Sequence, residues 1–329
     1  MSYWENKKVL VTGASGFVGS NLTKRLISEG AYVVTFSPGG IKAPSLLVSE
    51  GLVEKIGKEE KGSVLEFAKL NRLVKKEKIQ VIYHLAGQPL VEVGRESPIK
   101  TFDVNIRGTW NVLEVGRRNN VENFVVASTT HVYGDNPNLP YKEEYYPQPS
   151  GPYETSKACA DLLSQSFADT YDLPVEIPRF TNIFGPGDYN FGRLVPKVIK
   201  SILDRKNVEV WDVGAVRDFL FIKDAIDAYL LLVEKKLPKE KRIRVMNFGS
   251  GKPIKIVELA RKIVKLYGDK KLKFIIKRLP EERAKEIKKQ YVSISKAEKE
   301  LCWKPKYSLD DGLRETFEWY RKYKREILL

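Results

Sequence analysis

The chain has 329 residues, of which 42% are hydrophobic and 30% are charged, a composition typical of a folded globular protein rather than a disordered one. Its two cysteines and two histidines lie far apart, at Cys159, Cys302, His84 and His131. This scarcity argues against a disulfide scaffold, a Cys/His metal site and a Ser-His-Asp triad, so we expect no metal. It also fits a reducing compartment.

The formal net charge is +15, from 57 basic and 42 acidic side chains. The basic residues concentrate late in the chain and are mixed with glutamates, without the aromatic-studded stripe of a single-strand nucleic-acid binder. We therefore expect no nucleic-acid partner and interpret these residues as solvated helix faces. A positive potential would also favour an anionic small substrate.

No apolar run approaches the ~18 residues of a transmembrane helix, and residues 1–6 lead directly into a strand-like segment. We therefore expect no signal peptide, no membrane contact and a cytoplasmic location. Lysine and glutamate are abundant, while cysteine and methionine number two each. This bias is seen in proteins of thermophiles, and the general amino-acid usage of the source lineage is an equal alternative explanation.

Strand and helix patterns alternate through the first half of the chain. An apolar run at residues 7–12 precedes a helix pattern at 16–29, whose apolar residues share one face. The further expected elements are strand 32–36, helix 64–76, strand 81–85, a helix after Pro98, strand 123–128, a helix after Pro152 and strand 175–180. This alternation predicts an α/β fold with a doubly wound parallel sheet, a Rossmann fold.

Past residue 180 the pattern loosens into a loop rich in Gly, Pro and Asn, and then into short strands and helices. Strands are expected at 208–211, 244–248 and 272–276. A last helix is expected from Ser308, a suitable N-cap, with Asp310 and Asp311 in its first turn.

This change of pattern predicts two domains. Residues 1–180 would form the Rossmann domain and residues 181–329 a smaller C-terminal domain that binds the substrate. A return of part of 208–235 to the first domain is left open as an alternative.

Three glycines, Gly13, Gly16 and Gly19, lie between the first strand and the first helix. Glycines let the backbone approach a pyrophosphate, whose charge meets the helix N-terminus. The Gly-x-x-Gly-x-x-Gly spacing resembles the short-chain dehydrogenase/reductase type. Ser37 ends the second strand, where an acidic residue usually bonds the ribose. The cofactor is therefore expected to be NAD, with NADP as an alternative.

Tyr153 and Lys157 are four residues apart at the start of the helix after Pro152, so they share one helical face. A nearby ammonium and a nicotinamide cation favour the phenolate form of tyrosine. We expect the Tyr153 pKa to fall by about three units, which corresponds to roughly 4 kcal/mol.

Several segments together resemble one family and cover nearly the whole chain. They are 13–19, 84–88, Asn105, Ser128 with Thr129, Tyr153 with Lys157, 179–187, 217–219 and 303–305. The chain resembles the extended short-chain dehydrogenase/reductases, and among them the NAD-dependent nucleotide-sugar epimerases and dehydratases. Residues 84–90 and 187–196 look most like CDP-glucose 4,6-dehydratases, whereas 133–137 and 217–219 look more like UDP-sugar 4-epimerases.

The resemblance implies a nucleoside-diphosphate sugar as substrate and a 4-keto intermediate, with Tyr153 taking the proton of the sugar 4-hydroxyl as hydride leaves carbon 4. The implied catalytic residues are Tyr153, Lys157, Thr129, Ser128 and His131. The implied cofactor-binding residues are Gly13, Ser15, Gly16, Phe17, Val18, Gly19, Ser37, Leu85, Ala86, Gln88, Asn105 and Lys157. The implied substrate-binding residues are Gln88, Thr130, Asn182, Arg193 and Arg217.

Thr130 and His131 bear on which reaction follows. Dehydratases of the family usually carry an aspartate acid and then a glutamate or lysine base at these positions. Thr130 is no comparable acid, although His131 could serve as a base. We therefore favour a 4-epimerase. The alternatives are a 4,6-dehydratase of CDP-glucose or GDP-mannose type with an atypical acid/base pair, and a non-catalytic dinucleotide-binding regulator, motivated by Ser37 and Lys58.

A homodimer is also expected. Family members pair through the two helices after Pro98 and Pro152. In this sequence those helices carry extra apolar positions, at Trp110, Leu113, Leu162, Leu163 and Phe167.

Overall fold

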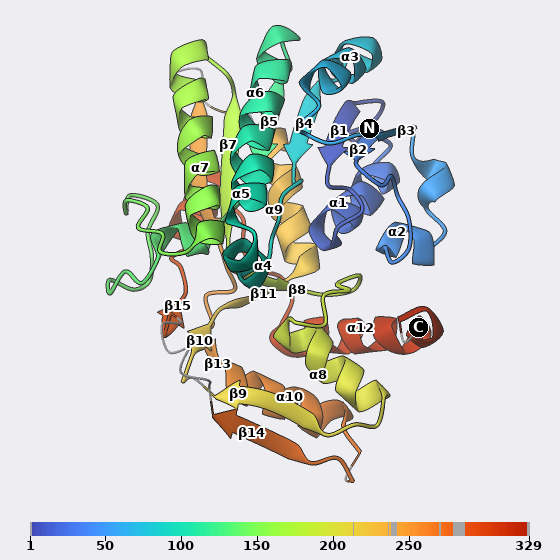
Figure 1. Ribbon diagram of the computed structural model, residues 1–329, viewed down its shortest axis with the longest axis vertical. Coiled ribbons are helices and arrows are strands. Elements are labelled where there is room, and N and C mark those ends of the chain that lie inside the picture. The colour runs from blue at the N-terminus through green and yellow to red at the C-terminus, as the bar shows by residue number, and fades with distance from the viewer. Residues whose placement is uncertain are drawn as a thin grey trace.

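The fold is built around one large sheet with helices on both faces (Figure 1). The structure is a computed structural model and describes residues 2–212, 214–235, 237, 242–269, 271–278 and 287–327. The strands of the large sheet are β1 (Lys8–Thr12), β2 (Tyr32–Ser37), β3 (Lys58–Lys61), β4 (Val81–His84), β5 (Asn123–Val126), β6 (Ser128–Thr129), β7 (Val175–Phe180) and β12 (Ile243–Phe248).

Seven of these strands follow the order β12-β7-β5-β4-β1-β2-β3, and β6 pairs with β7 as the eighth. All pairings in the sheet are parallel. The chain runs outward from β1 to β3 and then returns to β4, so the order reverses between β1 and β4. In a doubly wound sheet, ligands bind outside the carboxyl ends of the strands at this reversal.

The strands are apolar on both faces because helices cover both. On β1, Val9 and Val11 pack into one hydrophobic cluster and Leu10 into another. The first cluster includes residues of α1 (Phe17–Ser28) and α9 (Ile222–Glu234), which pack side by side. The second includes residues of α3 (Phe67–Glu77) and α6 (Gly108–Arg118), with α7 (Pro152–Tyr171) packed beside α6. The predicted doubly wound Rossmann fold is therefore confirmed.

Short helical segments connect these elements. They are α2 (Leu46–Ser49), η1 (Val53–Lys55), α4 (Val91–Glu96), α5 (Pro98–Phe102), the π-helical turn η2 (Asp103–Arg107) and η3 (Thr130–Tyr133). The segment η2 joins α5 to α6 and places Asn105 beside the loop that follows β4.

A smaller layer lies below the carboxyl ends of the large sheet in Figure 1. Its strands form three small sheets: β8 (Asn182–Phe184) with β11 (Phe219–Phe221), β9 (Val208–Asp212) with β14 (Phe274–Arg278), and β13 (Ile254–Lys255) and β15 (Lys289–Gln290) on either side of β10 (Val216–Arg217). Its helices are α8 (Leu194–Leu203), α10 (Ile256–Tyr267), α12 (Leu309–Lys322) and α13 (Lys324–Ile327), whereas α11 (Ser295–Leu301) packs against β12 at the edge of the large sheet.

Most predicted elements lie within three residues of their expected bounds. The strand expected at 123–128 is interrupted at Ala127, which separates β5 from β6. The strand expected at 244–248 is β12, which pairs with β7 at the edge of the large sheet. Ser308 caps α12 by accepting a bond from the Asp311 amide at 3.1 Å. Among the residues that the structure describes, no helix is long and apolar enough to cross a membrane.

A buried ion pair ties the edge strand β12 to β7. The Arg244 guanidinium donates to both carboxylate oxygens of Glu176, at 2.8 and 2.7 Å. Its Nη2 also donates to the carbonyls of Leu232 and Lys235, at 2.9 and 2.6 Å, at the end of α9. Burial raises the pKa of Glu176 to about 7, against the opposing influence of Arg244. One arginine therefore links two strands and a helix.

We predict that Glu176→Leu lowers the free energy of unfolding by about 3–5 kcal/mol, because it leaves the Arg244 charge buried without a partner. The double variant Glu176→Leu/Arg244→Met should recover at least half of this loss, since an apolar pair of similar volume replaces two buried charges. Urea denaturation measures both.

The matched control for this prediction is Glu315→Gln, which breaks the exposed Lys223–Glu315 pair and should cost less than about 1 kcal/mol. A double variant as unstable as Glu176→Leu would show that the pair is not the origin of the loss.

Candidate active site

The turn between β1 and α1 brings the backbone close to the neighbouring strand end. At Gly13, with φ +75°, a Cβ atom would lie 2.7 Å from the Ala86 amide nitrogen, and at Gly19 it would lie 2.1 Å from the Gly13 carbonyl oxygen. Larger residues do not fit at either position. No side chain of the described residues caps the start of α1, and Gly16 at this position is exposed. The helix N-terminus is thus available to a pyrophosphate.

A chain of hydrogen bonds joins the ends of β1 and β4. Thr12 Oγ1 lies 2.8 Å from His84 Nδ1 and accepts a bond from the Ala86 amide at 3.2 Å. His84 Nε2 lies 3.1 Å from Thr109 Oγ1 on α6. Burial, together with the positive charge of Lys157, lowers the His84 pKa to about 3, so the ring is neutral. His84 therefore supports the turn as a packed, uncharged residue.

Ser37 ends β2 beside this turn. Its hydroxyl is buried and has no hydrogen-bond partner among the described residues. A buried hydroxyl without a partner costs free energy unless a ligand satisfies it. The end of β2 is where a dinucleotide presents its ribose hydroxyls in this fold. Ser37 and the glycine turn together therefore fit a dinucleotide cofactor.

Asn105 fixes the loop after β4. Its Oδ1 accepts a bond from the Gln88 amide at 2.7 Å, and its Nδ2 donates to the Gln88 carbonyl at 3.1 Å and to Ser156 Oγ on α7 at 2.8 Å. The Gln88 amide side chain is itself bonded to Leu90 and Thr101. The loop that carries Leu85 and Ala86 is thus clamped to the helix that carries Tyr153.

Tyr153 lies in the first turn of α7, opposite the end of β6. The Thr129 side chain and the positive charge of Arg193 both act on its hydroxyl, in the direction that lowers the pKa. Burial nevertheless raises the Tyr153 pKa to about 12, while Arg193 and Thr129 act in the lowering direction. The sequence predicted a lowered pKa. That prediction is wrong for the chain alone, because loss of water outweighs the nearby positive charge.

Lys157 lies one turn further along α7. Its Nζ donates to the carbonyl of Ala127, the residue between β5 and β6. Burial lowers the Lys157 pKa to about 8, with Asp161 acting in the raising direction. Lys157 is therefore held at the end of β5, close enough to His84 at the end of β4 to influence its pKa.

Ser128 belongs to a buried network rather than to the tyrosine. Its hydroxyl donates to Asp161 at 2.7 Å, and Asp161 also accepts bonds from Arg179 at 2.8 and 2.9 Å. Arg179 in turn donates to the Tyr133 hydroxyl at 2.9 Å. Of the two hydroxyls considered for the tyrosine, Ser128 is thus engaged elsewhere, and Thr129 is the one that acts on the Tyr153 pKa.

Thr130 and His131 follow in η3, against the start of α7. His131 Nδ1 lies 3.7 Å from Glu154 Oε1, and its ring meets the Tyr153 ring edge-on with centroids 6.0 Å apart. Burial raises the Glu154 pKa, but His131, the Glu154 amide and Arg95 outweigh it, so the pKa lies below its ordinary value. The Thr130 hydroxyl is buried and has no partner among the described residues.

The three residues expected to bind the substrate diphosphate lie in three different surroundings. Arg193 precedes α8, pairs with Asp188 at 3.1 Å and lies over the Phe17 ring at 6.0 Å, close to the turn. Asn182 lies on β8, where its backbone N–H donates to the Asp218 carbonyl. Arg217 is buried, and its guanidinium donates to the carbonyls of Ile287 and Lys288.

Sequence reasoning missed three side chains of this region. Glu154 is one of the three unspecified positions of the Tyr-x-x-x-Lys pattern, so the pattern assigns it no role. The signal that could have found it is its carboxylate, which directly follows the tyrosine in the sequence. Asp161 and Arg179 lie 18 residues apart on α7 and β7, and nothing in their spacing signals a contact.

Comparisons with known proteins agree with this geometry. A model of the NAD dependent epimerase/dehydratase family matches residues 9–249. UDP-glucose 4-epimerase from Thermotoga maritima, solved with UDP-glucose, is 26% identical with a TM-score of 0.85, covering 96% of this chain and 99% of its own. dTDP-glucose 4,6-dehydratase from Bacillus anthracis, in complex with NAD, is 27% identical with a TM-score of 0.83, covering 97% and 98%.

The dTDP-D-glucose 4,6-dehydratase of Mus musculus is 30% identical, over 96% of this chain and 89% of its own length. Similar proteins thus include both epimerases and dehydratases. The resemblance inferred from the sequence is confirmed at the level of the family.

We predict that Tyr153→Phe lowers nucleotide-sugar turnover by at least about 100-fold, because it removes the hydroxyl that handles the proton. The dissociation constant for NAD should stay nearly unchanged, since we expect the dinucleotide to bind to the backbone of residues 13–19. Calorimetry gives the binding, and chromatography of UDP-glucose, CDP-glucose, GDP-mannose and dTDP-glucose reactions gives the turnover. Tyr146→Phe, at a side chain 85% exposed, is the control. Substantial turnover by Tyr153→Phe would contradict the role of this residue.

Proposed function

The chain belongs to the NAD-dependent epimerase/dehydratase family, and we propose that it is a nucleotide-sugar 4-epimerase that works through a 4-keto intermediate. The observation that carries this proposal is the pairing of Tyr153 with Thr129, next to a position, Thr130, that has no carboxylic acid. The first feature supports oxidation at carbon 4. The second disfavours the elimination of water.

The cofactor of the proposal is NAD, with NADP as the alternative at Ser37, which neither repels nor binds a phosphate strongly. The residues that would hold it are Gly13, Ser15, Gly16, Phe17, Val18, Gly19, Ser37, Leu85, Ala86, Gln88, Asn105 and Lys157. NAD, when bound, supplies the hydride acceptor for carbon 4 and a positive charge that favours the tyrosine phenolate. Gln88 and Asn105 would act through the backbone of the loop that they brace.

The protein side chains would handle the proton. Tyr153 Oη takes the proton of the sugar 4-hydroxyl as hydride leaves carbon 4, and later returns it. Thr129 holds the same oxygen through its hydroxyl. Lys157, fixed by the Ala127 carbonyl, holds the cofactor ribose. Ser128 contributes indirectly, through its bond to Asp161.

The substrate of the proposal carries a diphosphate. Arg193 lies over the Phe17 ring and its charge acts on Tyr153, so its guanidinium would bind a phosphate next to the sugar. Asn182 and Thr130 would complete this side of the site. Arg217 and Gln88 were also expected there. Their side chains already donate hydrogen bonds, Arg217 to the Ile287 carbonyl and Gln88 to the Thr101 hydroxyl, so we assign them no main role in holding the substrate.

An elimination would need a proton donor for the leaving hydroxyl at carbon 6. A threonine hydroxyl holds its proton too tightly for this task. Glu154 is the nearest carboxyl group to His131, but its lowered pKa keeps it ionised at neutral pH. Losing a positioned acid typically costs about 100- to 10,000-fold in rate. The epimerase is therefore favoured over the 4,6-dehydratase.

We also propose a two-domain organisation and a reducing, cytoplasmic location. By the predicted bounds, residues 1–180 would form the dinucleotide-binding domain and residues 181–329 the substrate domain. Because α9 packs on α1 and β12 extends the large sheet, we assign these two elements to the dinucleotide-binding domain; for α9 this is the alternative in which part of 208–235 returns to it. Cys159 and Cys302 are both free, which suits a reducing compartment.

Product analysis tests the proposed reaction. Incubation with UDP-glucose, CDP-glucose, GDP-mannose and dTDP-glucose should give an isomer of unchanged mass from one of them, because no acid is positioned at Thr130. Mass spectrometry distinguishes this isomer from a product that has lost one water, and chromatography identifies the epimer. Loss of water as the main outcome would overturn the epimerase proposal in favour of a dehydratase.

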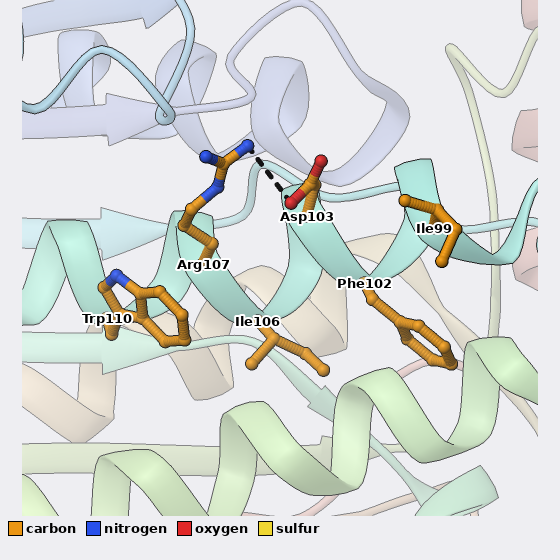
Figure 2. Close-up of a pocket in the computed structure, with 6 residues that line it drawn as sticks. All are labelled: Ile99, Phe102, Asp103, Ile106, Arg107 and Trp110. Atoms are coloured by element: carbon orange, nitrogen blue, oxygen red, sulfur yellow. Dashed lines mark ion pairs between the residues drawn. The ribbon is translucent and has the colours of Figure 1, made fainter.

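A homodimer is the second part of the proposal. Phe102, Ile106 and Trp110, on α5, η2 and α6 in turn, line a surface pocket that Figure 2 shows, and all three elements pack near α7. Ile99 is 73% exposed, Trp110 41% and Leu162 on α7 51%. Exposed apolar groups gathered on two neighbouring helices indicate a surface for another chain. Leu113 was expected there as well, but it is fully buried in the core.

We predict that Trp110→Glu weakens the dimer by at least about 2 kcal/mol per copy, because it places a charge in an apolar contact. Light scattering should then show monomers at micromolar concentration. Ile276→Glu on β14, at a side chain 42% exposed, is the matched control and should stay dimeric. A wild-type protein that is already monomeric would remove this proposal.

A further inference from the structure

The loop that precedes α8 contacts α1 at both of its ends. At its start, Asn21 Nδ2 on α1 donates to the carbonyls of Pro186 and Phe17, each at 3.0 Å. At its end, the Arg193 guanidinium lies over the Phe17 ring, 6.0 Å from the ring centroid. Phe17 is the first residue of α1 and follows the glycine turn directly. The loop therefore carries Arg193 to the N-terminus of α1.

Asp188 is a buried residue of this loop, 2% exposed. Its Oδ1 accepts a bond from the Asn190 backbone N–H at 3.1 Å, and its Oδ2 accepts one from Arg193 Nη1 at 3.1 Å. The Asp188 carbonyl accepts a bond from the Tyr320 hydroxyl on α12. One carboxylate oxygen thus holds the loop and the other holds the arginine, while α12 fixes the residue from behind.

The two partners of this ion pair differ in exposure. Burial raises the pKa of Asp188, and Arg193 and the Asn190 N–H act in the lowering direction. The Arg193 side chain is 37% exposed, and among the described residues its guanidinium hydrogen-bonds only to Asp188. A guanidinium has five N–H donors, so the donors that Asp188 leaves over are available to a phosphate.

We propose that Asp188 is a positioning residue, which holds the Arg193 guanidinium at the start of α1 in the orientation that receives the diphosphate of the substrate. The identity of that ligand, a nucleoside diphosphate, rests on the proposed function. Ordering a long side chain on binding costs conformational entropy. An arginine that a carboxylate already orders has lost this freedom before the ligand arrives, so it binds the ligand more tightly. Asp188 itself would contact neither substrate nor cofactor.

The same arginine acts on the tyrosine. The charged and titratable groups around Tyr153 are Glu154 and Lys157 on α7, His131 on η3, Tyr229 on α9 and Arg193 before α8. Glu154 raises the Tyr153 pKa, and Arg193 lowers it. Asp188 would affect the tyrosine only through Arg193. Release of the arginine should therefore raise the pKa of the phenol, because a positive charge favours the phenolate.

A simpler role for Asp188 would be structural. The bond from the Asn190 N–H to Oδ1 closes a turn that aspartate and asparagine form equally well. Asparagine at position 188 would keep this bond but lose the charge that holds Arg193. The variant Asp188→Asn therefore separates the two roles, because a purely structural role predicts no effect on ligand binding or on the tyrosine.

The experiment compares wild type, Asp188→Asn, Arg193→Gln and the double variant. Calorimetry on the NAD-loaded protein measures the binding of UDP, CDP, GDP and dTDP. For the nucleotide that wild type binds, Asp188→Asn should weaken binding by about 2- to 10-fold, because the arginine must then be ordered on binding. Arg193→Gln should weaken it by at least about 10-fold. The double variant should equal Arg193→Gln, since a positioning residue has no effect once its arginine is gone.

Ultraviolet difference spectroscopy of the NAD complex gives a readout that needs no substrate. The tyrosinate signal that is lost in Tyr153→Phe belongs to Tyr153. Its midpoint should lie about one pH unit higher in Asp188→Asn and in Arg193→Gln than in wild type, because both variants remove the positive charge from the phenol. A residue that only shapes the loop would not move this midpoint.

The matched control is Asp204→Asn, which breaks the Lys200–Asp204 pair at the other end of α8 and should behave as wild type. Circular dichroism verifies that each variant folds. If Asp188→Asn does not fold, Tyr320→Phe takes its place, because it removes the bond that fixes the Asp188 carbonyl. The same directions of change are then expected.

Unchanged diphosphate binding in Asp188→Asn would overturn the proposal, and so would an unchanged or lowered tyrosinate midpoint. A double variant that binds more weakly than Arg193→Gln would also overturn it, because Asp188 would then act by another route. Failure of wild type to bind any of the four nucleotides would overturn the proposed function. The tyrosinate midpoint does not depend on that outcome and tests the hold of Asp188 on Arg193 separately.

Discussion

The buried ion pair of Asp161 with Arg179 holds helix α7 against the strand ends where the site assembles. Asp161 receives two bonds from Arg179 and one from Ser128, which ties α7 to β7 and β6 together. Neither charge is stable in the interior without the other, so these three elements cannot shift independently. With Ser128 engaged in this way, the next residue, Thr129, is the hydroxyl that meets Tyr153. The placement of the reacting groups therefore depends on a contact that takes no part in the chemistry.

Burial also decides the charge of the site. It raises the pKa of Tyr153 to about 12 and lowers that of Lys157 to about 8, so both groups are pushed toward their neutral forms. Only Arg193 and the Thr129 hydroxyl act on the tyrosine in the other direction. The chain alone thus keeps the proton on the phenol. Positive charge that arrives with a ligand is what would release it, which couples proton transfer to a filled site.

The sequence predicted correctly those features of the structure that depend on residues close together in the chain. The turn at Gly13 and Gly19 and the strands buried on both faces are visible in residue type and spacing, and the structure agrees. Strand β3 was missed because Lys58–Lys61 is charged throughout and lies at a sheet edge. The contacts of Arg217 with the carbonyls of Ile287 and Lys288, and of Asp161 with Arg179, join distant segments. Spacing carries no information on such pairs.

The same limit applies to the proton chemistry. At the sequence level Thr130 lacks the acid of the dehydratase pattern, while His131 could still serve as a base. In the structure a carboxylate that the pattern ignores, Glu154, faces His131 from the next element. Its lowered pKa makes it a poor acid but a good partner for a protonated imidazole. With no acid at Thr130, the proposed site has nothing to donate to a leaving hydroxyl. Whether water would be eliminated therefore depends on where the carboxylate lies, beside His131 or at the leaving group.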